Sequence, residues 1–157
     1  MKIIFPTLGI LLLCMTACQP SNKQLYHEQI AAAHQQISTA FRHMEQHFQL
    51  FEAKKIELPQ LKREVMVFNT KADAVRMQIK SMEGKEQLKL KSAALKYING
   101  LKTVVNKEYK NLAGIVTMSD VPLNRAEDET VASAIAKSTA ALEATFLKHL
   151  QAHMDHK

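Results

Sequence analysis

The chain has 157 residues, with 21 Lys and Arg, 15 Asp and Glu and two Cys, and its formal net charge is +6. A chain of this length buries most of its apolar surface in one core, so a single domain is expected. The positive surplus would suit nucleic acid, but the N-terminal residues indicate export, and an exported protein meets anionic lipid headgroups instead. We therefore expect an anionic lipid or an envelope protein as partner, and no nucleic acid.

Residues 1–17 have the pattern of a bacterial signal peptide. Lys2 is followed by an uncharged, mostly apolar run that ends at Ala17, and polar residues begin at Gln19. This run is shorter than the roughly 20 apolar residues needed to cross a bilayer. The sequence therefore predicts a leader that is removed, rather than a retained membrane helix.

Met15-Thr16-Ala17-Cys18 resembles the lipobox of bacterial lipoproteins, in which the Cys sulfur is acylated and the chain is cut before that Cys. The resemblance implies that Cys18 carries the lipid and becomes the first residue of the mature chain. Cys14, the other cysteine, follows the large Leu13 and belongs to the leader. The mature protein would then have no free thiol and no intramolecular disulfide. The competing interpretation is a chance Cys beside an ordinary secretory cleavage site.

Residues 18–23 form the lipidated N-terminus and a short polar tether in this interpretation. Five extended residues reach only about 15 to 18 Å, so the folded part should lie close to the bilayer. Gln19, rather than Asp, follows the lipidated Cys. Where enteric-type sorting rules apply, this residue favours the outer membrane. The predicted location is therefore the bacterial cell envelope, with lipid anchoring to the outer membrane.

Apolar residues recur at spacings of three and four in four segments, which indicates helices with one buried face each. The segments run from about 22 to 53, from 58 to 82 with Pro59 in a first turn, from 88 to 116, and from about 125 to 153. The main buried positions expected in the first and third segments are Tyr26, Ile30, Ala33, Ile37, Ala40, Met44, His47, Phe51, Leu88, Leu95, Ile98, Leu101, Val105, Tyr109, Leu112 and Val116. No segment shows the period of two that strands require.

Short connections make consecutive helices antiparallel neighbours, because a few residues cannot carry the chain back along some 40 Å. The sequence therefore predicts an all-α protein, with residues 24–157 forming a single up-down-up-down antiparallel four-helix bundle. A turn is expected at residues 118–124. Gly100 and Gly114 in the third segment mark either a close helix contact or a kink.

The histidines are the candidate metal ligands. If the first and fourth helices run antiparallel, His27 falls near His149 and His153, which lie four residues apart on one helical face. Three imidazoles suit Zn or Cu, and His156 is a candidate fourth ligand. The competing interpretation is a set of solvated histidines, since the end of a helix dipole favours cationic side chains. His27, His149 and His153 are the predicted metal site.

His43 and His47 also lie four residues apart and could share a metal ion. His47 falls among the buried positions of the first helix, where it is more typical of a histidine at the core edge than of a ligand. The chain contains no Glu-x-x-His for a di-iron bundle and no Cys-x-x-Cys-His for covalent haem. A haem held by Met and His leaves no spacing signature, so haem stays an alternative beside Zn and Cu.

No motif for catalysis is found in the sequence. There is no Gly-x-Ser-x-Gly, no Gly-rich phosphate loop and no Cys outside the leader and lipobox. We therefore expect no enzyme and no cofactor beyond the covalent lipid on Cys18, with a bound metal ion as the alternative. Lys85, Lys89, Lys91 and Lys96 are interpreted as a solvated face that could also meet phosphate groups or an acidic partner.

Residues 95–112 are similar to the third helix of a family of small helical bacterial lipoproteins with no assigned activity, the spirochaete surface-lipoprotein-like group. The shared elements are Tyr26, Lys91-Ser92-Ala93-Ala94-Leu95, Glu108-Tyr109, Asp120-Val121-Pro122-Leu123 and Phe146. The resemblance implies a helical, membrane-anchored protein without catalytic residues. The leading hypothesis is a non-enzymatic envelope lipoprotein with an interaction or structural role. The alternative is a periplasmic metal or haem binder.

Overall fold

A computed structural model describes residues 21–83, 87–118 and 125–155 of the chain. Every regular element within these ranges is helical, and none of the described residues lies in a strand. The elements are α1 (Asn22–Glu52), α2 (Leu58–Ser81), α3 (Leu88–Thr103), the π-helix η2 (Val104–Tyr109), α4 (Lys110–Met118) and α5 (Arg125–Asp155). Because α3, η2 and α4 follow one another without a gap, they form one rod. The prediction of an all-α chain with four helices is confirmed.

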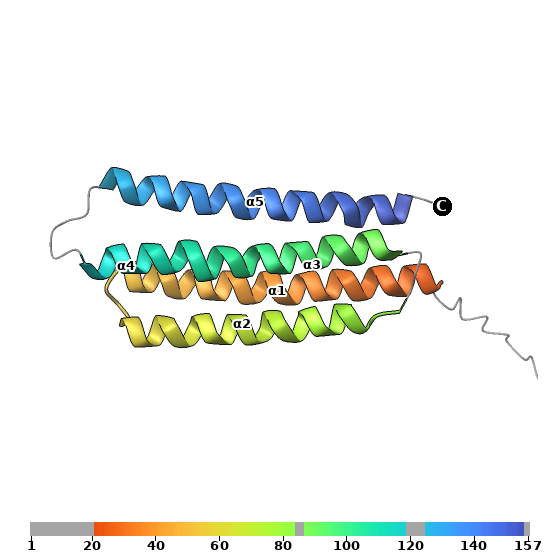
Figure 1. Ribbon diagram of the computed structural model, residues 1–157, viewed down its shortest axis with the longest axis horizontal. Coiled ribbons are helices and arrows are strands. Elements are labelled where there is room, and N and C mark those ends of the chain that lie inside the picture. The colour runs from red at the N-terminus through yellow and green to blue at the C-terminus, as the bar shows by residue number, and fades with distance from the viewer. Residues whose placement is uncertain (1–20, 84–86, 119–124, 156–157) are drawn as a thin grey trace, which may run out of the picture.

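The four rods lie side by side along one axis, and the last turn of α5 lies at the same end of the molecule as the first turn of α1 (Figure 1). Helix α1 packs chiefly against α2, and α3 packs chiefly against α5. The predicted signal peptide, Cys18, the turn beyond Met118 and His156 lie outside the described residues.

Local sequence signals set the ends of α1 and α2. The Ser21 hydroxyl accepts a hydrogen bond from the Gln24 amide at 3.1 Å, which caps the start of α1. Helix α1 ends where Lys54 adopts a φ of 55°, a left-handed conformation typical of helix C-termini. Glu57 and Gln60 then form a capping box, and Pro at the first turn of α2 needs no amide hydrogen.

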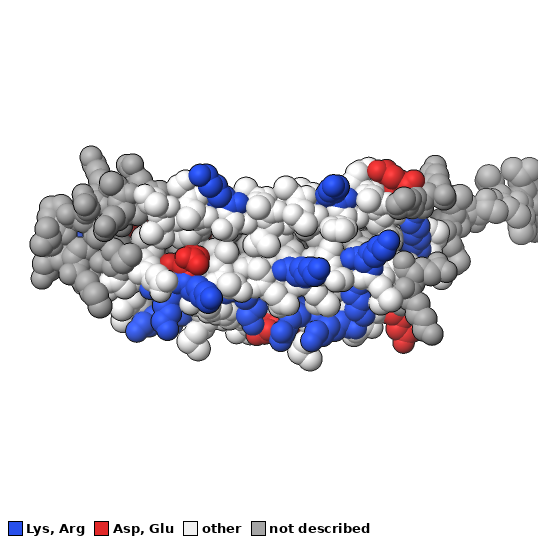
Figure 2. Space-filling view, turned by 45° about the horizontal axis from the view of Figure 1, so that its top comes forward, with Lys and Arg blue, Asp and Glu red and all other residues white. Residues whose placement is uncertain are grey.

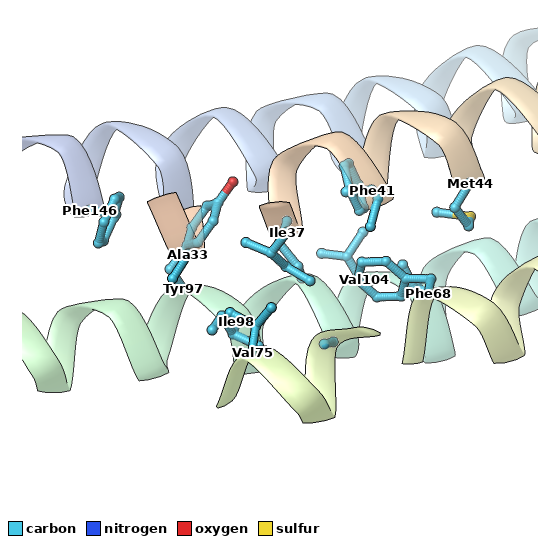
Figure 3. Close-up of a cluster of buried hydrophobic side chains, with 14 of the residues drawn as sticks. Ala33, Ile37, Phe41, Met44, Phe68, Val75, Tyr97, Ile98, Val104 and Phe146 are labelled. Carbon is cyan, nitrogen blue, oxygen red and sulfur yellow. The ribbon is translucent and has the colours of Figure 1, made fainter. Parts of the chain in front are cut away.

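Helix α1 lies in contact with each of the other rods, and its predicted apolar face forms the centre of the core (Figure 3). Phe41 of α1 packs edge to face against Phe68 of α2, with ring centroids 5.9 Å apart. Tyr97 of α3 stacks on Phe146 of α5 at 5.3 Å. No described polar or charged residue is fully buried, so burial of apolar side chains is the main stabilising term.

The predicted face of α3 was partly wrong. Leu88 is the first residue of the helix and is 61% exposed. The side chains of α3 that enter the core are Leu90, Ala93, Ala94, Tyr97, Ile98 and Leu101. Alanine is only weakly apolar, so Ala93 and Ala94 did not indicate that they, rather than Leu88, belong to the buried face of α3. Gly100 fits the prediction of a close helix contact, because a Cβ there would lie 2.5 Å from Cδ2 of Leu142 on α5.

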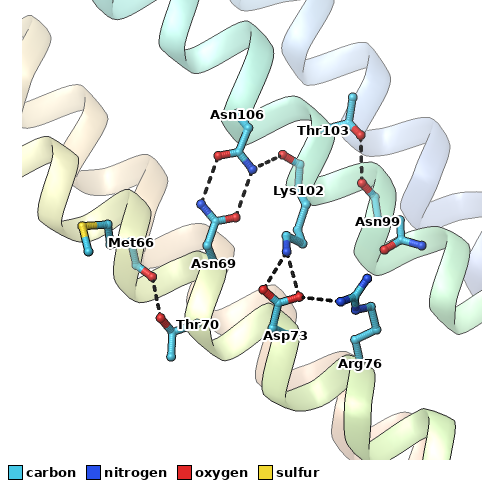
Figure 4. Close-up of polar contacts among 9 residues, drawn as sticks. All are labelled: Met66, Asn69, Thr70, Asp73, Arg76, Asn99, Lys102, Thr103 and Asn106. Carbon is cyan, nitrogen blue, oxygen red and sulfur yellow. Dashed lines mark hydrogen bonds and ion pairs between the residues drawn. The ribbon is translucent and has the colours of Figure 1, made fainter.

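A polar network joins α2 to the α3–η2 rod (Figure 4). The amides of Asn69 and Asn106 donate to each other over two 3.0 Å hydrogen bonds. One helical turn away, Lys102 Nζ donates to both carboxylate oxygens of Asp73 at 2.8 Å, and Arg76 contacts the same carboxylate at 3.1 Å. These contacts fix the rotation of α2 against its neighbour, which apolar packing alone specifies less tightly.

Exchange of Lys102 for Met is expected to raise the pKa of Asp73. The hydrogen bond from Lys102 is the main reason that this pKa lies below its ordinary value of 3.8. A lowered folded-state pKa contributes stability that is present above about pH 3.8 and is lost as the pH falls through the folded-state value. An NMR titration of the Asp73 carboxyl measures the change. Lys89→Met is the matched control, and an unchanged Asp73 pKa in Lys102→Met would contradict the assignment.

Candidate functional site

The third rod contains a π-helical segment that the sequence analysis did not predict. In η2 the backbone hydrogen bonds join residues five apart, rather than four apart as in an α-helix. This inserts one extra residue and rotates the side chains of α4 relative to those of α3. Two side chains accompany it: the Asn106 amide donates to the Lys102 carbonyl at 2.8 Å and the Thr103 hydroxyl donates to the Asn99 carbonyl at 3.0 Å. Such bonds to the preceding turn bend helices. Single π turns are frequent at functional sites.

A groove with a volume of about 540 Å³ lies beside η2. It is bounded by the end of α1, the first half of α2 and the η2–α4 segment. The described residues that line it are Phe48, Leu58, Leu61, Lys62, Val65, Met66, Asn69, Val105, Asn106, Tyr109, Lys110, Ala113, Gly114 and Thr117. Most of these side chains are apolar, and Met66 is 68% exposed. The molecule therefore offers apolar surface to solvent at this place.

The position of the groove follows from the packing of α2. Asn69 and Asn106 line it and also form the amide pair that holds α2 to η2. Towards the start of α2 the groove opens between α2 and α4. A Cβ on Gly114 would meet no atom within 4 Å, so the hollow extends to the backbone of α4. The groove thus extends from the Asn69–Asn106 amide pair towards the start of α2.

The groove is lined mainly by the part of the chain that carries its positive surplus. Residues 58–118, which make up α2 to α4, contain 12 Lys and Arg and five Asp and Glu, whereas the whole chain has a net charge of +6. Figure 2 shows one face of the molecule on which Lys and Arg side chains outnumber Asp and Glu. The charged residues among the described lining are Lys62 and Lys110. The potential around the groove therefore favours an anion.

A second cleft, of about 530 Å³ and more polar, lies between α1 and α5. The Ser38 hydroxyl is 3.3 Å from Nε2 of His34, and Oε1 of Glu143 is 3.7 Å from the same nitrogen. In a catalytic triad the hydroxyl and the carboxylate contact opposite nitrogens of the imidazole. Ser38 also bonds to the Tyr97 hydroxyl at 3.0 Å. Burial lowers the pKa of His34, although the charge of Glu143 opposes the shift. The cluster has the geometry of a packed polar contact.

Two members of the predicted metal site lie together. The rings of His27 and His153 are stacked with centroids 6.1 Å apart, and His34 stacks on Phe146 at 4.7 Å. Between these two ring contacts, a step of seven residues along α1 corresponds to seven residues back along α5. Burial, followed by the charge of Lys23, lowers the pKa of His153.

His149 is exposed on α5. Among the described residues, a trio of His27, His149 and His153 does not bring its ligand atoms within 4.8 Å of one another, whereas His43, His47 and Glu64 do. His156 lies outside the described residues, so the site at this end of the molecule stays a prediction. The spacing of His43 and His47 is visible in the sequence, but nothing in the sequence indicates that the carboxylate of Glu64, on another helix, lies opposite them.

The described part of the chain contains no helix that is both long and apolar enough to cross a bilayer. Comparisons with protein-family models, with curated proteins and with solved structures gave no match to this chain. The resemblance to the spirochaete surface-lipoprotein-like group therefore stays a prediction.

Proposed function

We propose that this chain is a lipid-anchored, non-enzymatic protein of the bacterial cell envelope that binds a single-chain anionic amphiphile in the groove beside η2. In this proposal Cys18 carries the lipid, and residues 24–157 form one up-down-up-down antiparallel bundle. The groove is the observation that carries the binding role. It combines an apolar lining, an open path to solvent and two lysines.

The chemistry of the lining suits an acyl chain with an acidic head. Burial of each methylene against Phe48, Leu61 or Val65 contributes about 0.8 kcal/mol. The groove volume of about 540 Å³ falls within the range of roughly 300–1,000 Å³ that is typical of small-molecule sites. Lys62 or Lys110 would pair with the acidic head, while a neutral apolar molecule would gain nothing from either lysine.

The position of the groove argues against occupation by the protein's own lipid. Phe48 follows Asn22 by 26 residues, which is about 39 Å along a helix. Because α1 begins at Asn22, an extended tether from Cys18 to the start of α1 would span at most about 13 Å. Acyl chains on Cys18 that are inserted in the bilayer would therefore remain at the other end of the bundle. The groove is proposed to take a separate amphiphile, at a distance from the membrane that holds the anchor.

The polar cleft between α1 and α5 supports a role without catalysis. A serine nucleophile needs a base that is oriented by a carboxylate on its far nitrogen, and it needs donors for an oxyanion. Ser38 and Glu143 instead approach the same nitrogen of His34.

Exchange of Gly114 for Leu is expected to block the groove and to leave the fold intact. The space around the missing Cβ is open, so the leucine side chain extends into the groove. Leucine also favours a helix over glycine by about 0.8 kcal/mol, so stability should not fall. The measurement is binding of a fluorescent fatty acid to the purified full chain, and we expect at least tenfold weaker binding, or about 1.4 kcal/mol.

Gly114→Ala is the matched control, because a single methyl group leaves most of the groove open. The double variant Lys62→Gln, Lys110→Gln is expected to weaken binding of the fatty acid and to leave binding of the corresponding fatty alcohol unchanged. Saturable binding that Gly114→Leu does not alter would reject the groove as the site.

A further inference from the structure

Three side chains with metal-binding atoms face one another across the contact between α1 and α2. His43 and His47 lie one turn apart on α1, and their ring centroids are 4.5 Å apart. Glu64 of α2 lies opposite both: its Oε2 is 3.5 Å from Nδ1 of His43, and its Oε1 is 4.0 Å from Nε2 of His47. One ligand atom from each residue lies within 4.8 Å of the others.

A backbone contact fixes the orientation of one imidazole. Nδ1 of His47 is 2.9 Å from the carbonyl oxygen of His43. A carbonyl oxygen only accepts, so Nδ1 carries the hydrogen and the lone pair of the neutral ring is on Nε2. Nε2 is the atom that faces Glu64. A second hydrogen bond of this kind is the usual means by which proteins orient a histidine ligand.

The Glu64 carboxylate makes no short hydrogen bond to either imidazole. Distances of 3.5 and 4.0 Å exceed the about 2.7–2.9 Å of a charge-assisted hydrogen bond. The side chains of His47 and Glu64 are each 25% exposed and that of His43 is 58% exposed. Solvent therefore reaches the three side chains, and they have room to rotate. The capping box at Glu57 and Gln60 fixes the start of α2 two turns before Glu64.

We propose that His43, His47 and Glu64 bind one divalent transition-metal ion of the zinc class, with water at the remaining position. Two imidazoles and one carboxylate are a donor set that zinc takes in proteins, with metal–ligand distances of about 2.0–2.2 Å. Tetrahedral ligands at that distance lie about 3.3–3.6 Å from one another. The three atoms therefore reach this geometry by movements of about 1 Å, at one exposed and two part-exposed side chains. The ion would join α1 to α2.

This site is separate from the proposed groove and from the predicted site at His27, His149 and His153. His27 and His153 approach each other at the opposite end of α1 from His43 and His47. Within the described residues, no carboxylate joins them in a group of three. The two histidine pairs thus provide a matched comparison within one chain.

The test is a calorimetric titration of Zn²⁺ alone into the purified full chain, prepared without a histidine tag. We expect one equivalent to bind, and we expect Glu64→Gln and His47→Ala each to weaken the affinity at least tenfold. The double variant His27→Ala, His153→Ala should bind zinc as the unaltered protein does. A circular dichroism spectrum checks that each variant keeps its helices. We expect that it does, because none of the three side chains is fully buried.

Failure to bind zinc, or binding that Glu64→Gln and His47→Ala leave unchanged, would overturn the proposal. Loss of binding in the His27→Ala, His153→Ala variant alone would assign the ion to the other end of the molecule. Glu64→Gln keeps the size and shape of the side chain, so a loss in that variant reports on the carboxylate.

Discussion

Exchange of Cys18 for serine is expected to abolish lipid attachment and to remove the mature protein from the membrane fraction. The hydroxyl of serine does not form the thioether that the proposed anchor requires. Each buried methylene contributes about 0.8 kcal/mol to membrane binding, so one acyl chain holds marginally whereas three hold effectively without release. The products are either unlipidated protein or a precursor that keeps residues 1–17. Intact mass distinguishes these two from the acylated form.

The basic surface requires a stringent fractionation. A net charge of +6 for the full chain, or +5 once Lys2 is lost with the proposed leader, attracts the protein to anionic headgroups even without an anchor. Salt screens this attraction beyond about 10 Å at 0.1 M. Membranes should therefore be washed at high salt before the bound fraction is measured. Cys14→Ser is the matched control, because this thiol lies within the proposed leader. The anchor hypothesis fails if the Cys18 variant stays on washed membranes as a fully processed chain.

Helical periodicity was sufficient to predict the number and the approximate bounds of the rods. Seven of the eight buried positions predicted in α1 are buried, because large apolar residues there flank the two alanines, Ala33 and Ala40, at regular spacings of three and four. His47 is the exception, and it lies part-exposed at the edge of the core. His47 lies beside the buried face of α1, as its spacing predicts. Its polar imidazole keeps it at the edge of that face rather than inside the core.

The candidate sites could not be read from the sequence, since each depends on contacts between helices. The π segment at Val104–Tyr109 leaves no periodic signal, yet it sets the rotation of α4 and with it one wall of the groove. The sequence does not indicate that Glu64 lies beside His43 and His47, because Glu64 follows the second histidine by 17 positions, beyond a turn. Periodicity predicts which face of a helix is buried, but it does not predict which residues two faces bring together.

Exchange of Phe68 for Ala is expected to be among the most destabilising single changes in the core. Phe68 is 1% exposed and packs edge to face on Phe41 with centroids 5.9 Å apart (Figure 3). Truncation of a buried phenylalanine costs about 3–5 kcal/mol, which is a large share of the roughly 5–15 kcal/mol that a domain has.

Urea unfolding followed by circular dichroism measures this loss for Phe68→Ala. The adjacent Val67 is 44% exposed, so Val67→Ala should change the free energy of unfolding by no more than about 0.5 kcal/mol. A loss below about 1 kcal/mol in Phe68→Ala would mean that the α1–α2 contact collapses around the cavity, because the cost of such a cavity depends on how far its walls relax. The full loss would instead indicate that α1 and α2 hold a rigid spacing, on which the facing of His43 and His47 towards Glu64 depends.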